Sequence, residues 1–248
     1  MKKKSCFILG LPSSGKTTFL AALWYSLQQK DKTLLQLKEF NGNQKYLTDL
    51  CNTWIGIEKV SRTSIANEQE NLTVLLKHSN EDLFEISFPD LSGESFQKQY
   101  TDREIKNETA DNILATDGLL IFINPSETTH PCLITDINDV TRLSDDSDKV
   151  IVSRNPSRDD PTEVQLVELL QFIEEIRDGQ KYNLGVIISA WDLKEANKFK
   201  LPEEYVKDQL PLLWQFLYTN KFGIVNNSSV ETSKELFRYP SMMNTAMG

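Results

Sequence analysis

The sequence predicts a three-layer α/β fold, in which helices cover both faces of a mostly parallel β-sheet that includes one antiparallel hairpin strand. Short apolar runs alternate along the chain with longer segments whose apolar residues recur at helical spacing. Two of the runs are almost entirely apolar, as expected of strands that helices cover on both faces. A glycine-bearing loop separates the first run from the first helical segment, which indicates a strand, a loop and a helix in succession.

The first strand and the first helix are the clearest elements of the pattern. Residues 5–9 form an apolar run that stops at Gly10. Residues 17–29 carry large apolar side chains at the spacing of one helix face. The loop between these two elements therefore lies at the carboxyl end of a strand, where α/β folds bind their ligands.

The middle of the chain predicts four further strands. Residues 72–77 and 83–88 are apolar runs joined by the turn-like residues 79–82, so we expect them to pair as a hairpin. Residues 118–124 and 184–189 are the two nearly uninterrupted apolar runs. We expect these last two strands to be parallel and buried in the centre of the sheet.

The second half of the chain also predicts two helical segments and a final strand. Residues 161–177 place apolar side chains on one stripe and acidic ones on the other, and Pro161 suits a first helical turn. Residues 201–219 form a second helical segment, which Pro211 should break or kink because proline cannot continue a helix. We expect a last strand at about residues 222–226.

Length and composition favour a single globular domain over residues 1–248, of which 39% are hydrophobic. Two polar segments, at about 31–71 and 126–160, are interpreted as insertions because they are too long or too polar for simple connections. The 36 acidic against 27 basic side chains give a net charge of −9, which argues against nonspecific binding to nucleic acid. No apolar run reaches the length of a membrane span, and we expect a cytoplasmic protein.

A phosphate-binding loop is the strongest motif in the sequence. Residues 10–17 read Gly-Leu-Pro-Ser-Ser-Gly-Lys-Thr, which is the pattern of glycine, four residues and Gly-Lys-Thr between a strand and a helix. In such a loop the backbone amides and the helix N-terminus surround the phosphates, Lys16 reaches the β and γ oxygens, and Thr17 offers its hydroxyl to magnesium. The candidate phosphate-binding residues are Gly10, Ser13, Ser14, Gly15, Lys16, Thr17 and Thr18.

A second motif follows the expected hairpin, where Asp90 comes after an apolar strand and Gly93 stands three residues later. This resembles the Asp-x-x-Gly motif of GTPases. Together with the phosphate loop, it makes the chain resemble Ras-like GTPases of the translation-factor-related class, from residue 5 to about residue 230. The resemblance implies a P-loop NTPase fold with Ras-like topology, binding of GTP or GDP with magnesium, Asp90 at the metal and the Gly93 amide at the γ-phosphate.

The residue after this glycine departs from the family pattern. Ras-like relatives carry a glutamine there that orients the attacking water, whereas this chain has Glu94. A carboxylate can position water or act as a base, but it also repels the γ-phosphate, so we expect slow hydrolysis. Pro12 and Ser13 stand where many relatives have glycine, which crowds the approach of an arginine from a partner. The candidate catalytic residues are Lys16, Glu94 and the first-switch residue Thr63.

The resemblance also implies a first-switch threonine that completes the magnesium shell. Thr63 is the first choice by position, and Ser64 and Thr53 are alternatives. The magnesium ligands implied by the family are therefore Thr17, Asp90 and Thr63. Arg62 and Arg103 flank the expected switches and are candidates for charge-stabilising arginines within the chain.

The base-binding motif is only partly retained. Guanine-specific relatives carry Asn-Lys-x-Asp after the fifth strand, where this chain has Ser189-Ala190-Trp191-Asp192. Asp192 keeps the two acceptors that guanine needs, so guanine is favoured, and Trp191 either stacks on the base or is buried. Ser228 and Ser229 resemble the loop that contacts the guanine oxygen. These variants look like the bacterial double-GTPase type of domain, which is often encoded beside partner proteins in conflict and defence systems.

The leading hypothesis is a GTP-binding molecular switch that hydrolyses GTP slowly to GDP and presents its switch regions to a protein partner. One alternative is a P-loop ATPase or small-molecule kinase, which should bring arginines over the phosphates. The other is a scaffold that holds nucleotide without hydrolysing it. The sequence leaves homo-oligomerisation open.

Overall fold

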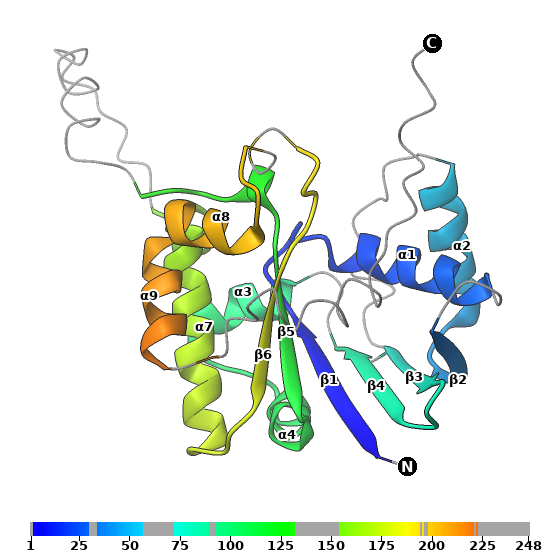
Figure 1. The fold of residues 1–248 in the computed structure, drawn as a ribbon. Helices are drawn as coiled ribbons and strands as arrows, with labels where there is room; N and C mark the ends of the chain where they lie inside the picture. Colours follow the sequence, from blue (N-terminus) through cyan, green and yellow to red (C-terminus); the bar gives the residue numbers. More distant parts are fainter. Residues whose placement is uncertain are drawn as a thin grey trace, which may run out of the picture.

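The computed structural model describes residues 2–29, 34–56, 72–89, 93–131, 154–193, 195, 198–220 and 222. These residues form an α/β fold in which one six-stranded sheet lies between two layers of helices (Figure 1). The strand order is β2-β3-β4-β1-β5-β6. The sheet and its two helical layers confirm the predicted fold class.

The sheet is mostly parallel. Its strands are β1 (Lys3–Leu9), β2 (Leu35–Asn41), β3 (Leu72–His78), β4 (Leu83–Phe88), β5 (Gly118–Ile123) and β6 (Asn183–Ile188). Strand β1 pairs in parallel with both β4 and β5, and β5 pairs in parallel with β6. Strand β3 pairs antiparallel with both β2 and β4. Among the described strands, β3 is therefore the one that runs against the others, and the predicted hairpin is confirmed.

The helices divide between the two faces of the sheet. Helices α1 (Lys16–Gln28) and α2 (Gln44–Ile55) cover one face (Figure 1). The other face is covered by α3 (Glu94–Asp102), α4 (Asn107–Ala115), α7 (Thr162–Arg177), α8 (Pro202–Gln209) and α9 (Pro211–Thr219). The described residues also include two short helical elements, η2 (Pro125–Glu127) and α6 (Pro156–Asp159). None of the described helices is long and apolar enough to cross a membrane.

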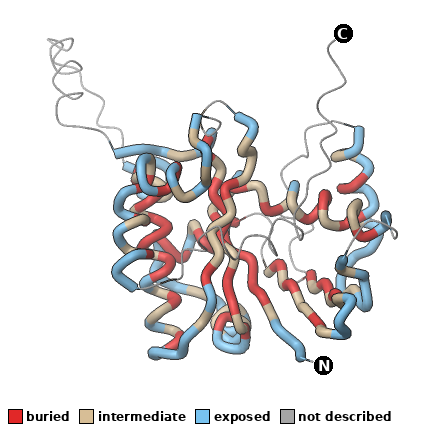
Figure 2. The backbone as a smooth tube through the Cα atoms, in the orientation of Figure 1, coloured by how far each residue is buried: buried red, intermediate tan, exposed pale blue. Residues whose placement is uncertain are grey.

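The core consists of two clusters, one on each face of the sheet, and β1 contributes to both. Phe7 and Leu9 pack in the cluster under α7, whereas Ile8 packs in the cluster under α1. Successive side chains of a strand point to opposite faces, so a central strand must be apolar at every position to bury both. Figure 2 shows this burial along the middle of the sheet and on the inward sides of the helices. The continuous apolar run at 5–9 follows from this central place.

The structure confirms the predicted elements with ends that differ by one or two residues. The helical segment at 201–219 is broken as expected, because α8 ends at Gln209 and α9 begins at Pro211. The expected strand at 222–226 lies, apart from Phe222, outside the described residues.

The polar segment at 31–71 contains two elements that its sequence pattern does not predict, namely β2 and α2. Within the described part of the chain, β2 is an edge strand that pairs with β3 alone, and it is mostly exposed, so its sequence lacks an apolar run. Helix α2 buries only Leu47, Leu50 and Cys51. The short helices α3 and α4 were missed for the same reason, since they bury few apolar side chains.

Arg177, at the end of α7, fastens α4 to the helical layer. Its guanidinium is 3% exposed and donates hydrogen bonds to the backbone oxygens of Ile113 and Thr116, where α4 ends. The guanidinium carbon lies 4.8 Å from the ring centre of Tyr182. Burial lowers the pKa of Arg177. The guanidinium therefore satisfies carbonyl groups that a helix end leaves without partners.

We expect Arg177→Lys to lower the free energy of unfolding by about 2 kcal/mol, because a lysine cannot reproduce the planar fork that serves both carbonyls. Urea denaturation measures this change. The matched control is Arg158→Lys, an exposed arginine paired with Asp159, for which the free energy of unfolding should stay at its wild-type value because exposed ion pairs contribute little. Equal losses in the two variants would contradict the capping role.

Candidate functional site

The candidate site lies at the carboxyl ends of β1, β4, β5 and β6, where the parallel strands meet the loops that follow them. The loop of residues 10–15 connects β1 to α1. Because β1 lies between β4 and β5, the segments that leave these two neighbours reach this loop from either side.

Two glycines allow the loop its close approach to the neighbouring strands. Gly10 has φ 154°, and a Cβ there would lie 2.5 Å from Ser14 Oγ and 3.1 Å from the Phe122 backbone oxygen. Gly15 has φ 97°, a left-handed conformation that favours glycine, and its Cβ would lie 2.7 Å from the Cβ of Ser189. Both positions of the motif are thus required by backbone geometry.

Polar residues at the ends of β5 and β6 hold the loop in place. The Ser189 hydroxyl donates to the Ser14 backbone oxygen at 2.9 Å, and the Asn124 side-chain amide donates to the Ser13 backbone oxygen at 3.0 Å. The sequence motifs did not predict that Ser189 and Asn124 bond to the loop. A polar residue directly after an apolar strand was the available signal, since such residues collect at this edge of a parallel sheet.

Lys16 is buried inside the loop to which it belongs. Its side chain is 2% exposed, and Nζ donates to the backbone oxygens of Gly10 at 2.7 Å and Leu11 at 3.0 Å and to Ser14 Oγ at 3.3 Å. A buried ammonium group needs such oxygen acceptors to offset its lost hydration. Thr17 is half-buried and Thr18 exposed in the same first turn of α1.

Gly93 brings the start of α3 directly against this loop. It has φ 79°, and a Cβ there would lie 2.7 Å from three atoms: the Gly10 carbonyl oxygen, the Leu11 carbonyl carbon and Lys16 Nζ. Residues 77 or more positions apart in the sequence thereby lie side by side. Glu94 is the first residue of α3 and is exposed. The structure thus brings Gly93, Lys16 and the loop carbonyls together.

The candidate base-binding residues lie just after β6. Asp192 is exposed. Trp191 is half-buried, packs against the core under α7, and meets Tyr205 edge-on with ring centres 6.3 Å apart. Of the two interpretations of Trp191, these contacts favour the packed side chain.

Several predicted site residues lie outside the described part of the chain, namely Arg62, Thr63, Ser64, Asp90, Ser228 and Ser229.

Two other candidates of the sequence analysis are engaged elsewhere. Thr53 lies on α2, where its hydroxyl donates to the Asp49 backbone oxygen at 3.0 Å. Arg103 forms an ion pair with Glu168 of α7 and lies over the ring of Tyr100.

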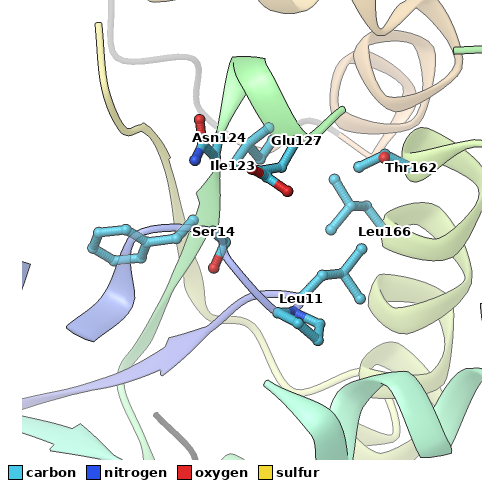
Figure 3. A pocket seen from close by; sticks show the side chains of 9 residues that line it. Leu11, Ser14, Ile123, Asn124, Glu127, Thr162 and Leu166 are labelled. Carbon is cyan, nitrogen blue, oxygen red and sulfur yellow. The ribbon is translucent and has the colours of Figure 1, made fainter. Parts of the chain in front are cut away.

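A small cavity lies beside the loop, on the side of α7 (Figure 3). Its volume is about 30 Å³. The loop residues Leu11 and Ser14 face Glu127, Thr162 and Leu166 across it. A space of this size holds a water molecule or two and no nucleotide.

A parallel sheet with a glycine-bounded, lysine-containing loop after its central strand defines the class of P-loop nucleotide-binding proteins. A model of the family described as Double-GTPase 1 matches residues 7–228, and the chain belongs to this family. No curated protein matched the chain. The protein is therefore a GTP-binding protein. By its membership of this family, it belongs to the GTP hydrolases in general.

The contact at Gly93 can be tested against a glycine of nearly the same conformation. Gly179 has φ 77° and nothing within 4 Å of a Cβ there, whereas Gly93 has φ 79° and the three close atoms described above. Alanine at either position should cost about 1–2 kcal/mol of unfolding free energy for the left-handed backbone. Gly93→Ala should in addition displace α3 or the loop and weaken GTP binding by about tenfold.

Gly179→Ala should leave the dissociation constant for GTP unchanged, since it adds no contact near the loop. Urea denaturation and nucleotide titration of the two variants measure both effects. Identical GTP affinities would show that the start of α3 does not restrict the phosphate loop.

Proposed function

We propose that the protein is a molecular switch, which binds GTP with magnesium, hydrolyses it slowly to GDP and presents its switch regions to a protein partner. The observation that carries this proposal is the contact of Gly93 with the phosphate loop and Lys16 Nζ. A γ-phosphate bound by Lys16 lies beside the backbone of Gly93, so GTP and GDP contact the start of α3 differently. A difference of this kind is what a ligand needs in order to shift a conformational equilibrium.

The phosphates would be held by the loop of residues 10–15 and by Lys16. The nucleotide then replaces the acceptors that Lys16 now uses, the backbone oxygens of Gly10 and Leu11. The N-terminus of α1, where Gly15 provides no side-chain cap, favours an anion at the same place.

The donor set suits magnesium, because hydroxyl and carboxylate oxygens are the hard ligands that this ion prefers. Thr17, half-buried in the first turn of α1, would supply one of them. By family resemblance, Asp90 and Thr63 would complete the set. The ion would neutralise charge on the β- and γ-phosphates.

Slow hydrolysis follows from the residues around the γ-phosphate. Glu94 is exposed at the start of α3 and brings negative charge to the place where relatives carry a neutral glutamine. Of the two candidate arginines, Arg103 lies in the described part of the chain and is paired with Glu168. The transition state would then depend on another cation, and a cation supplied by a partner would let that partner control turnover.

The kinase alternative receives no support from the arginines of the described ranges, because each is bonded to groups of its own layer. Arg103 pairs with Glu168, and Arg177 caps α4. Arg154 pairs with Asp160 and Arg158 with Asp159. A non-hydrolysing scaffold is distinguished from the switch by phosphate release.

The phosphate assignment is tested with Lys16→Ala. Removing the ammonium should weaken GTP binding by about 100-fold or more, because charge-assisted contacts to two phosphates are lost. Titration with labelled GTP in the presence of magnesium measures the affinity, and phosphate release measures turnover. The matched control is Lys181→Ala, an exposed lysine between α7 and β6, which should bind as the wild type does. Wild-type affinity for GTP in Lys16→Ala would contradict the assignment of Lys16 to the phosphates.

The base assignment is tested with Asp192→Asn. Guanine offers two donors to a carboxylate, and an amide in its place repels one of them, so the preference for GTP over ATP should fall by about tenfold or more. Competition of labelled GTP against unlabelled GTP and ATP measures the ratio. Asp111→Asn, an exposed aspartate on α4, is the control. An unchanged ratio in Asp192→Asn would place the base elsewhere.

A further inference from the structure

The end of α3 far from the phosphate loop is fastened by a buried hydrogen bond. The Tyr100 hydroxyl donates to the carboxylate of Asp160, and the two residues are 9% and 6% exposed. Arg154 Nε donates to the same carboxylate at 3.0 Å. Burial and the bond to Asp160 raise the pKa of Tyr100 to about 12, whereas the bonds from Tyr100 and Arg154 lower the pKa of Asp160. At neutral pH the bond therefore joins a hydroxyl to a carboxylate, which makes it one of the strong kind.

Two further contacts tie α3 to its surroundings. The Gln97 amide donates to the Ser157 backbone oxygen at 2.9 Å, and Arg103 pairs with Glu168 of α7. Helix α3 thus packs against both α6 and α7.

One residue of α3, Gln99, destabilises the helix in the position that these contacts hold. Gln99 is fully buried, at 0% exposure, and neither its amide nitrogen nor its amide oxygen has a hydrogen-bond partner. A buried polar group without a partner costs more free energy than one that reaches water or another polar group. Any displacement of α3 that gives this amide a partner is therefore favoured by it.

The helix connects these residues to the phosphate loop. Tyr100 lies six residues after Glu94, which is about 9 Å along the helix axis. Gly93, directly before the helix, lies so close to the loop that a Cβ there would be 2.7 Å from Lys16 Nζ, the Gly10 carbonyl oxygen and the Leu11 carbonyl carbon. In this position of α3, Lys16 Nζ bonds to the carbonyls of Gly10 and Leu11, which are the acceptors that a γ-phosphate would replace.

We propose that Tyr100, Asp160 and Gln99 make α3 a two-position element that sets the preference of the site between GTP and GDP. The Tyr100–Asp160 bond holds the observed position, called here the resting position, in which Lys16 Nζ bonds to the carbonyls of its own loop. The unpartnered Gln99 amide favours departure from it. Tyr100 and Asp160 are positioning residues that act on the nucleotide through α3 and Gly93. This inference rests on the proposed switch function, and it assigns the regulation to residues outside the nucleotide site.

Two substitutions should move the nucleotide preference in opposite directions. Tyr100→Phe removes the hydroxyl, weakens the resting position and should raise the ratio of GTP to GDP affinity by about five- to tenfold. Gln99→Met keeps the side-chain shape, removes the unpartnered amide and should lower the same ratio by a similar factor. Asp160→Asn, which leaves a neutral acceptor, should act as Tyr100→Phe does but more weakly.

Magnesium-dependent titrations of each full-length variant with labelled GTP and GDP measure the ratio, and urea denaturation measures stability. The matched controls are Tyr218→Phe and Gln215→Met, the same substitutions at exposed positions of α9, which should leave the ratio at its wild-type value.

The outcomes separate this inference from the proposed function. Opposite shifts in Tyr100→Phe and Gln99→Met support the two-position helix. Changes in stability with an unchanged ratio would overturn it and leave the switch function intact, because the contacts would then be structural alone. If the wild-type protein binds neither nucleotide, the proposed function fails and this inference fails with it.

Discussion

The site depends on one constraint, the close packing of two backbone segments, the loop of residues 10–15 and the segment at Gly93, around the ammonium group of Lys16. That group is almost fully buried, so its charge needs oxygen acceptors at short range, and the carbonyls of Gly10 and Leu11 provide them. The carbonyls can turn inward only because the loop lies tightly against its neighbours. At Gly15 and Gly93 there is no room for a side chain. Glycine at these positions is therefore a packing requirement as well as a conformational one.

The strand order makes this packing possible. With β1 between β4 and β5, the segment after β4 delivers Gly93 to one side of the loop and the end of β5 delivers Asn124 to the other. Strand β6, one position further out, reaches the loop through Ser189. Each contact comes from a different connection, so the loop is held by the sheet as a whole. A rigid frame of this kind suits a site in which nucleotide should move α3 more than it moves the loop.

The sequence predicted the central sheet and the phosphate loop well, because both have local causes. Strands buried on both faces require continuous apolar runs, and the loop requires its glycines and lysine at fixed spacing. Edge strand β2 was not predicted, because it has neither a continuous apolar run nor a motif of fixed spacing. The Tyr100–Asp160 bond joins residues 60 positions apart, and no local pattern announces it. The tertiary arrangement alone brings such residues together, and the same holds for Gln99, whose burial contradicts its polarity.

The negative charge of Glu94 connects the start of α3 with the nucleotide and with the contacts of Tyr100 and Gln99. Glu94 lies in the first turn of the helix, where the helix dipole favours a negative side chain by about 0.3–1 kcal/mol. The same carboxylate repels an incoming γ-phosphate, so GTP would disturb the start of the helix that Glu94 stabilises. The Tyr100–Asp160 bond resists that disturbance at the other end, whereas the buried Gln99 amide assists it. Opposing terms of this size, each worth a few kcal/mol or less, are what a two-position element requires, since a larger imbalance would leave one position unpopulated.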